Sequence, residues 1–97
     1  MIARVTSVSI QPDKVADTTR IYNESILPAV KGASGNRGVF LLVDPASGQG
    51  ISITLWDSAA DGQAYDTGGT YREQVAKIAP FFASPPSLAT YEVGAQG

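Results

Sequence analysis

Apolar residues in the middle of the chain form two short runs separated by turn-forming residues. The first run, Gly38 to Val43, is apolar without interruption, as is typical of a strand covered on both faces. The second run, Ile51 to Trp56, alternates apolar residues with Ser52, Thr54 and Trp56. The DPASGQG between the runs supplies proline and glycine, so the stretch predicts a β-hairpin. We expect the face of the second run that carries Ile51 to pack against other apolar side chains. The face that carries Trp56 is expected to form a pocket wall or a subunit contact.

Helical spacing appears before and after this hairpin. Between Lys14 and Lys31 the large residues form one stripe, which predicts a helix packed on a sheet. Asp13 is a candidate N-cap, Pro28 is expected to kink or end the helix, and Gly32 to follow it as the C-terminal glycine. The stripe consists of Val15, Tyr22, Ile26 and Val30.

Two more helices are predicted after Trp56, each from a capping pattern. Ser58 followed by Asp61 predicts a short helix that ends at Thr67-Gly68-Gly69. Thr70 followed by Glu73 predicts a second helix, ended by Pro80 and a Ser84-Pro85-Pro86 loop. Its apolar stripe consists of Tyr71, Val75, Ile78 and Phe82.

Strands are predicted at both ends of the chain, over Ile2 to Ile10 and over Leu88 to Val93. The order of elements therefore predicts one α+β domain over residues 1–97, a ferredoxin-like βαββαβ sandwich whose helices cover one face of a four-stranded antiparallel sheet. Either Val39, Leu41 and Val43 or else Phe40 and Leu42 must then point away from the helices. Because that apolar area would otherwise meet water, we expect a homodimer through the open sheet face.

The amino-acid composition excludes several classes of function. The net charge is −2 and the seven Lys and Arg residues are scattered, which argues against nucleic acid. The chain has no cysteine and no histidine, so thiol chemistry and a Ser-His-Asp triad are excluded. A metal ion would need a site made of oxygen ligands alone, and the carboxylates are dispersed along the chain. No Walker or GxGxxG loop occurs. The amino terminus lacks a signal-peptide pattern and no run is long enough for a membrane helix, so a cytoplasmic protein is expected.

The element order, the strand ending in Leu55-Trp56-Asp57-Ser58, the segment TYREQVAKIAPFF and the short terminal strand resemble the antibiotic biosynthesis monooxygenase superfamily. The resemblance covers nearly the whole chain, from Met1 to about Val93. It implies a dimeric α/β barrel, often with exchange of the terminal strand. It also implies cofactor-independent oxidation of a planar phenol to a quinone.

The catalytic patterns of that superfamily match this chain only in part. In its monooxygenases an Asn lies four residues before the strand-end Trp; here the Trp is Trp56, but that position is Ser52. In its haem-degrading branch an Asn of the first strand and a His after the Trp hold the haem. This chain has Thr6 and Ser7 in that strand and Asp66 in place of the His, which argues against haem degradation.

The resemblance nominates residues for a small planar ligand. Trp56 would stack on it, Arg4 or Arg72 would stabilise a phenolate, and Ser52 or Tyr65 would hydrogen-bond the oxygenated intermediate. Further candidates for ligand contact are Thr6, Thr54, Tyr71 and Tyr91.

Each nominated residue has a structural alternative. Trp56 and Tyr71 could be packing residues, Ser52 and Thr54 hydrogen-bonded strand hydroxyls, and Arg72 a solvated charge. Arg4 could instead pair with Glu92 on an adjacent strand. A non-catalytic dimer that binds a metabolite, or that fills a stress or housekeeping role, is therefore the competing hypothesis.

Overall fold

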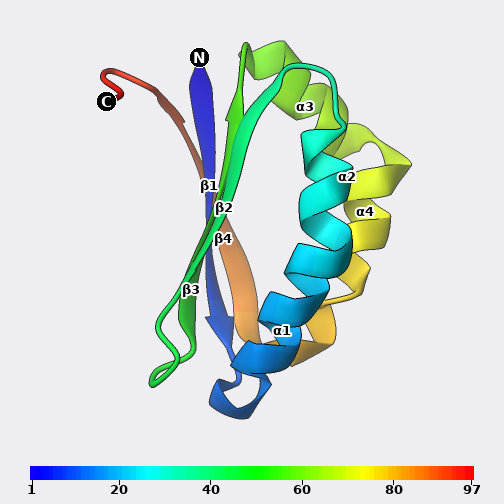
Figure 1. Cartoon of the computed structure of the whole chain (residues 1–97), viewed down its shortest axis with the longest axis vertical. Coiled ribbons are helices and arrows are strands. Elements are labelled where there is room, and N and C mark those ends of the chain that lie inside the picture. Colours follow the sequence, from blue (N-terminus) through cyan, green and yellow to red (C-terminus); the bar gives the residue numbers. More distant parts are fainter.

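The computed structural model describes residues 1–97 and has helices on one side of a four-stranded antiparallel sheet (Figure 1). The strands lie in the order β2-β3-β1-β4. This arrangement confirms the predicted α+β ferredoxin-like fold. The elements are β1 (Ile2–Ile10), α1 (Val15–Ile21), α2 (Leu27–Lys31), β2 (Asn36–Val43), β3 (Gln49–Trp56), α3 (Ala59–Thr67), α4 (Gly69–Ala76) and β4 (Phe82–Glu92).

The register of the sheet decides which side chains face the helices. Arg4 of β1 lies opposite Thr54 of β3 and Thr90 of β4, and Thr6 lies opposite Ser52. Directly opposed residues of an antiparallel pair share one face, so these side chains lie on the helix side. The other face, called here the open sheet face, carries no charged residue. It consists of Ala3, Val5, Ser7, Ser9, Gly38, Phe40, Leu42, Gln49, Ile51, Ile53, Leu55, Ser84, Ser87, Ala89 and Tyr91.

This register corrects the expectation that β2 is covered on both faces. β2 is an edge strand, and Phe40 and Leu42 are 51% and 50% exposed on the open sheet face. Ile51, in the face that was expected to be packed, is also exposed. The physical reason is that the helices cover one face only, so the uninterrupted apolar run is not a sign of double burial within one copy.

The first helical segment is continuous but not regular. A π-helical turn over Tyr22–Ile26 joins α1 to α2, and the backbone N–H of Leu27 donates to the carbonyl of Tyr22. The widened turn precedes Pro28, which lacks an N–H for the regular ladder. Asp13 lies in a 3₁₀ turn and caps nothing, so that expectation was wrong. Gly32 is the C-cap residue of α2, as predicted, and keeps a right-handed conformation.

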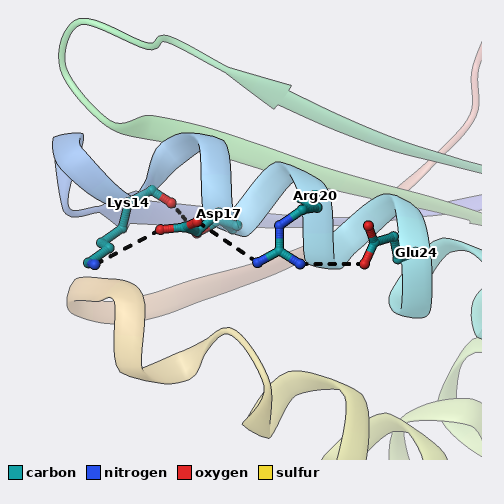
Figure 2. Close-up of polar contacts among 5 residues, drawn as sticks. Lys14, Asp17, Arg20 and Glu24 are labelled. Atoms are coloured by element: carbon teal, nitrogen blue, oxygen red, sulfur yellow. Dashed lines mark hydrogen bonds and ion pairs between the residues drawn. The ribbon is translucent and has the colours of Figure 1, made fainter.

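The outer surface of this segment is a row of alternating charges (Figure 2). Lys14 and Arg20 both pair with Asp17, and Arg20 also pairs with Glu24. These side chains are well exposed, so the pairs add little stability. They identify the solvated face of the helix, which leaves the stripe of Val15, Tyr22, Ile26 and Val30 to pack against the sheet.

The predicted start of α3 is confirmed and that of α4 is wrong. The hydroxyl of Ser58 accepts from the backbone N–H of Asp61. α4 begins two residues earlier than predicted, at Gly69, because its N-cap is Gly68 and not Thr70; Thr70 makes no capping bond. α4 then ends at Ala76, so its predicted stripe continues through a turn into β4.

The last strand is longer than predicted. β4 begins at Phe82 and includes Ser84, Pro85 and Pro86, which were expected to be a loop. It pairs only with β1, and its register shifts twice, between Ser7 and Ser9 and between Ser9 and Ile10. Pro85 and Pro86 lie at the first of these shifts, between Ser84 and Ser87, where the ladder to β1 is interrupted, so the strand tolerates their missing N–H groups.

Candidate functional site

A cavity of about 90 Å³ lies between the sheet and the helices. One water needs roughly 10–15 Å³ on a comparable measure, so the cavity has room for more than a single water. The exposed residues Pro86 and Leu88 of β4 belong to its wall and mark its open side. Its other lining residues are Arg4, Thr6, Val8, Ile10, Thr18, Tyr22, Ile26, Val30, Leu41, Ser52, Thr54, Tyr65, Asp66, Tyr71, Gln74, Val75, Ile78 and Phe82.

The cavity is polar at one end and apolar at the other. Along β1 its wall changes from Arg4 through Thr6 to Val8 and Ile10. β3 adds two hydroxyl residues to the polar part of this wall, because Thr54 lies opposite Arg4 and Ser52 lies opposite Thr6. A ligand that matches this wall has a polar head beside Arg4 and an apolar body toward Ile10.

An ion pair between Arg4 and Asp66 of α3 lies at the polar end. Their side chains are only 14% and 22% exposed. This corrects the expected pairing of Arg4 with Glu92: Glu92 lies opposite Ile2 at the end of the ladder, whereas Asp66 reaches Arg4 from the helix layer. Burial raises the pKa of Asp66, and the nearby Arg4 partly opposes that rise.

Gly62 sets how closely α3 approaches the sheet. A Cβ at this position would lie 3.0 Å from Cδ of Arg4 and 3.2 Å from Cδ1 of Trp56. Tyr65 and Asp66 follow Gly62 at positions i+3 and i+4, so all three lie on the face of α3 that meets the sheet. The close contact therefore brings both side chains to the cavity wall.

Trp56 lies behind the wall and not in it. The residue is 0% exposed, and its Nε1 donates to Oγ1 of Thr54 at 2.9 Å. Its ring packs on Tyr65, with 5.4 Å between the ring centroids. A ligand in this cavity therefore does not stack on Trp56, as was expected, because Tyr65 and α3 cover the indole. Trp56 is a packing residue.

Tyr65 is the aromatic residue that faces the cavity at this point. Its hydroxyl oxygen is buried without a hydrogen-bond partner. Its ring meets Tyr71 of α4 edge-on at 5.9 Å between centroids. Burial raises the pKa of both phenols, so both remain protonated donors at neutral pH. An unpaired buried donor of this kind is satisfied by a ligand that carries an acceptor.

Tyr22 also lines the cavity, although its place in an apolar helix stripe suggested only packing. Its hydroxyl and that of Ser52 are 2.8 Å apart, and Tyr22 itself is 4% exposed. Burial raises the pKa of Tyr22, and the bond to Ser52 partly offsets the rise. Ser52 lies thirty residues away in the sequence, so no local signal could have indicated this pair.

The remaining nominated residues divide between the cavity and the surface. Thr6, Thr54 and Tyr71 line the cavity. Arg72 is exposed on α4 and does not line it, because it lies off the inward stripe. Tyr91 is 58% exposed and lies on the open sheet face, opposite Ala3. The prediction that Arg72 and Tyr91 contact a ligand is therefore wrong for this cavity.

Sequence reasoning missed Gln74. This residue lines the cavity, and its side-chain carbonyl accepts from the hydroxyl of Ser25 at 2.8 Å. Lys77 in turn donates to Ser25 at 2.6 Å, so the three side chains join α4 to the first helical segment.

No cluster of three or more His, Cys, Asp or Glu side chains is placed to hold a metal ion. None of the helices has the length and apolar character needed to cross a membrane.

No family model matches the sequence. Two curated relatives from Mycobacterium tuberculosis, the uncharacterized proteins Rv2557 (strain H37Rv) and MT2634 (strain CDC 1551), are each 31% identical over 97 residues. The match covers 96% of this chain and 41% of each relative, so the chain spans less than half the length of these proteins.

Solved structures with the same architecture have lower sequence identity. A protein from Bordetella bronchiseptica titled "putative antibiotic biosynthesis monooxygenase" superposes with a TM-score of 0.83 at 20% identity, covering 94% of both chains. A protein of the same title from Nitrosomonas europaea gives a TM-score of 0.81 at 17% identity, covering 95% of this chain and 97% of the other. The chain therefore has the fold of the antibiotic biosynthesis monooxygenase superfamily, as its sequence resemblance predicted.

Proposed function

We propose that this chain is a cofactor-independent monooxygenase that oxidises a small planar phenol to a quinone. The observation that carries the proposal is the cavity with Arg4, Asp66 and the unpaired hydroxyl of Tyr65 at one end and an apolar wall at the other. That wall suits an aromatic body with one oxygen-bearing end. The likeness to structures titled as monooxygenases supports the reaction class.

In the overall reaction one phenol and one dioxygen give one quinone and one water. The ring carbon that is oxidised loses its hydrogen and gains one oxygen atom. The second oxygen atom leaves as water, with that hydrogen and the phenolic hydrogen. The substrate supplies the electrons and is oxidised, and dioxygen is reduced. The protein orients the phenol and stabilises its anion, which is the electron-rich form that reacts with dioxygen.

The residues of the cavity divide these tasks. The guanidinium of Arg4 stabilises the phenolate, and the hydroxyl of Tyr65 donates to an oxygen of the substrate or of the oxygenated intermediate. The apolar wall around Val8 and Ile10 excludes water from the ring. Trp56 supports the wall from behind by packing on Tyr65.

The competing proposal is a non-catalytic protein that binds a planar metabolite. Two bonds favour it: the hydroxyl of Ser52 is already bonded to Tyr22, and the hydroxyl of Thr54 accepts from Trp56. Both hydroxyls thus already have a hydrogen-bond partner within the chain. The hydroxyl of Tyr65, by contrast, is fully buried and has no partner within the chain.

We also propose that two copies associate through the open sheet face. Phe40, Leu42 and Tyr91 are each at least half exposed there, and none of the paired residues of this face is charged. A second copy is the partner that matches an uncharged, apolar sheet, since both surfaces then lose water.

Oxygen uptake in the presence of anthrone or a dihydroxynaphthalene tests the monooxygenase proposal. Uptake above the protein-free rate, in the presence of a chelator and with one labelled oxygen atom in the quinone, is expected. Val75→Phe fills the cavity and should abolish the reaction, whereas Glu73→Gln, on the exposed side of α4, should not change it. Tight binding of the phenol without oxygen uptake would support the non-catalytic protein instead.

A further inference from the structure

The ion pair of Arg4 and Asp66 poses an electrostatic problem for any phenolate. Both side chains line the cavity and both are largely buried. The pair is neutral as it stands. If a phenolate entered beside Arg4, it would lie next to the carboxylate of Asp66, and two like charges in a partly desolvated site repel strongly.

We propose, resting on the function above, that Asp66 is the proton acceptor of the site. The carboxylate takes the proton of the phenolic hydroxyl as the substrate binds, and Arg4 then pairs with the phenolate. The ligand O–H bond breaks, an O–H bond forms on the carboxylate, and the electron pair stays on the phenolic oxygen. The cavity has no net charge before and after the transfer, so neither state leaves an unpaired buried charge.

The groups around Asp66 fit this role. Arg4 faces it from β1, Tyr71 from α4 and Tyr65 from its own helix. Both tyrosines remain neutral donors because burial raises their pKa. Burial also raises the pKa of Asp66, which brings the carboxyl closer to the range in which a general base works near neutral pH.

Gly62 determines where Asp66 lies. The close contact of α3 with Arg4 and Trp56 at Gly62 fixes the helix one turn before Asp66. The carboxylate is therefore held by the packing of a helix on a sheet, a more rigid support than a loop.

Binding of 4-nitrophenol, whose phenolate absorbs visible light, tests the inference without turnover. At a pH about two units below the pKa of the free probe, where nearly all of the free probe is neutral, the wild-type protein should bind it as the phenolate and release almost no proton, because Asp66 keeps it. A carboxylic acid C=O band should appear in the infrared difference spectrum. Asp66→Asn should lose that band and release about one proton per bound phenolate. Arg4→Met should bind the probe as the neutral phenol.

Glu73→Gln is the matched control, since this exposed carboxylate does not line the cavity, and it should behave as the wild type. Release of a proton by the wild type, a bound probe that stays neutral, or no binding at all would overturn the inference. The wild-type measurements require no variant, so a misfolded variant does not weaken the test. Proton retention without oxygen uptake would instead overturn the monooxygenase proposal alone.

Discussion

The double substitution Phe40→Ser and Leu42→Ser on the edge strand β2 is predicted to dissociate the proposed dimer. Both side chains lie on the open sheet face, 51% and 50% exposed in the single copy. They make no contact with the cavity, so the substitution changes the association surface and leaves the candidate site in place.

The expected magnitude follows from the exposed fractions. Fully burying a phenylalanine or leucine side chain contributes about 1.5–3 kcal/mol, so covering the exposed half of each contributes about 0.8–1.5 kcal/mol. Two such residues on each of two copies contribute about 3–6 kcal/mol to association. Removing them should raise the dimer dissociation constant about 10²- to 10⁴-fold.

Sedimentation equilibrium across a concentration series measures this constant. Leu88→Ser is a matched control, because Leu88 is a leucine of an edge strand with 51% exposure but lies on the helix side of the sheet. The control should keep the wild-type dissociation constant. A wild-type protein that stays monomeric, or a control that dissociates as readily as the double variant, would refute the assignment of the open sheet face.

Two further predictions concern stability. Gly48→Ala should lower the free energy of unfolding by at least about 2 kcal/mol in urea titrations. Gly48 has a φ of 81°, and a Cβ at this position would lie 1.9 Å from the carbonyl oxygen of Ile10. Gly94→Ala is the control and should leave the free energy of unfolding unchanged, because the space around Gly94 is open. Asp66 has a raised pKa, so the folded state binds its proton more readily than the unfolded state does. Its contribution to the free energy of unfolding is therefore full below the ordinary pKa of an aspartate and is lost as the pH rises through the raised pKa. Over that range the free energy of unfolding of the wild type should fall relative to that of Asp66→Asn. A difference between the two proteins that does not change with pH would contradict this.

The architecture was predictable because each element carries its own periodic signal. The apolar stripe of the first helical segment, the alternation of β3 and the turn residues between β2 and β3 each predicted one element in its observed place. The start of β4 was not predictable in this way. Pro85 and Pro86 indicate a loop to any local reading, and only the edge position and the register shifts against β1 allow them in a strand.

The candidate site was predictable only in part. The alternation of β3 placed Ser52 and Thr54 correctly on the cavity side. The burial of Trp56 depends on the approach of α3 at Gly62, and a glycine within a short helix gives no sign of such a contact. Asp66 meets Arg4 across most of the chain length, so their pairing is a product of the tertiary fold.

The orientation of a bound phenol tests the account most directly. A crystal structure of the protein with 1-naphthol should show the ring against the apolar wall near Val8 and Ile10. Its hydroxyl should lie within hydrogen-bond reach of Asp66 or Tyr65, about 2.6–3.2 Å between heavy atoms. A naphthol bound with its hydroxyl toward Ile10, or bound only on the open sheet face, would contradict the account.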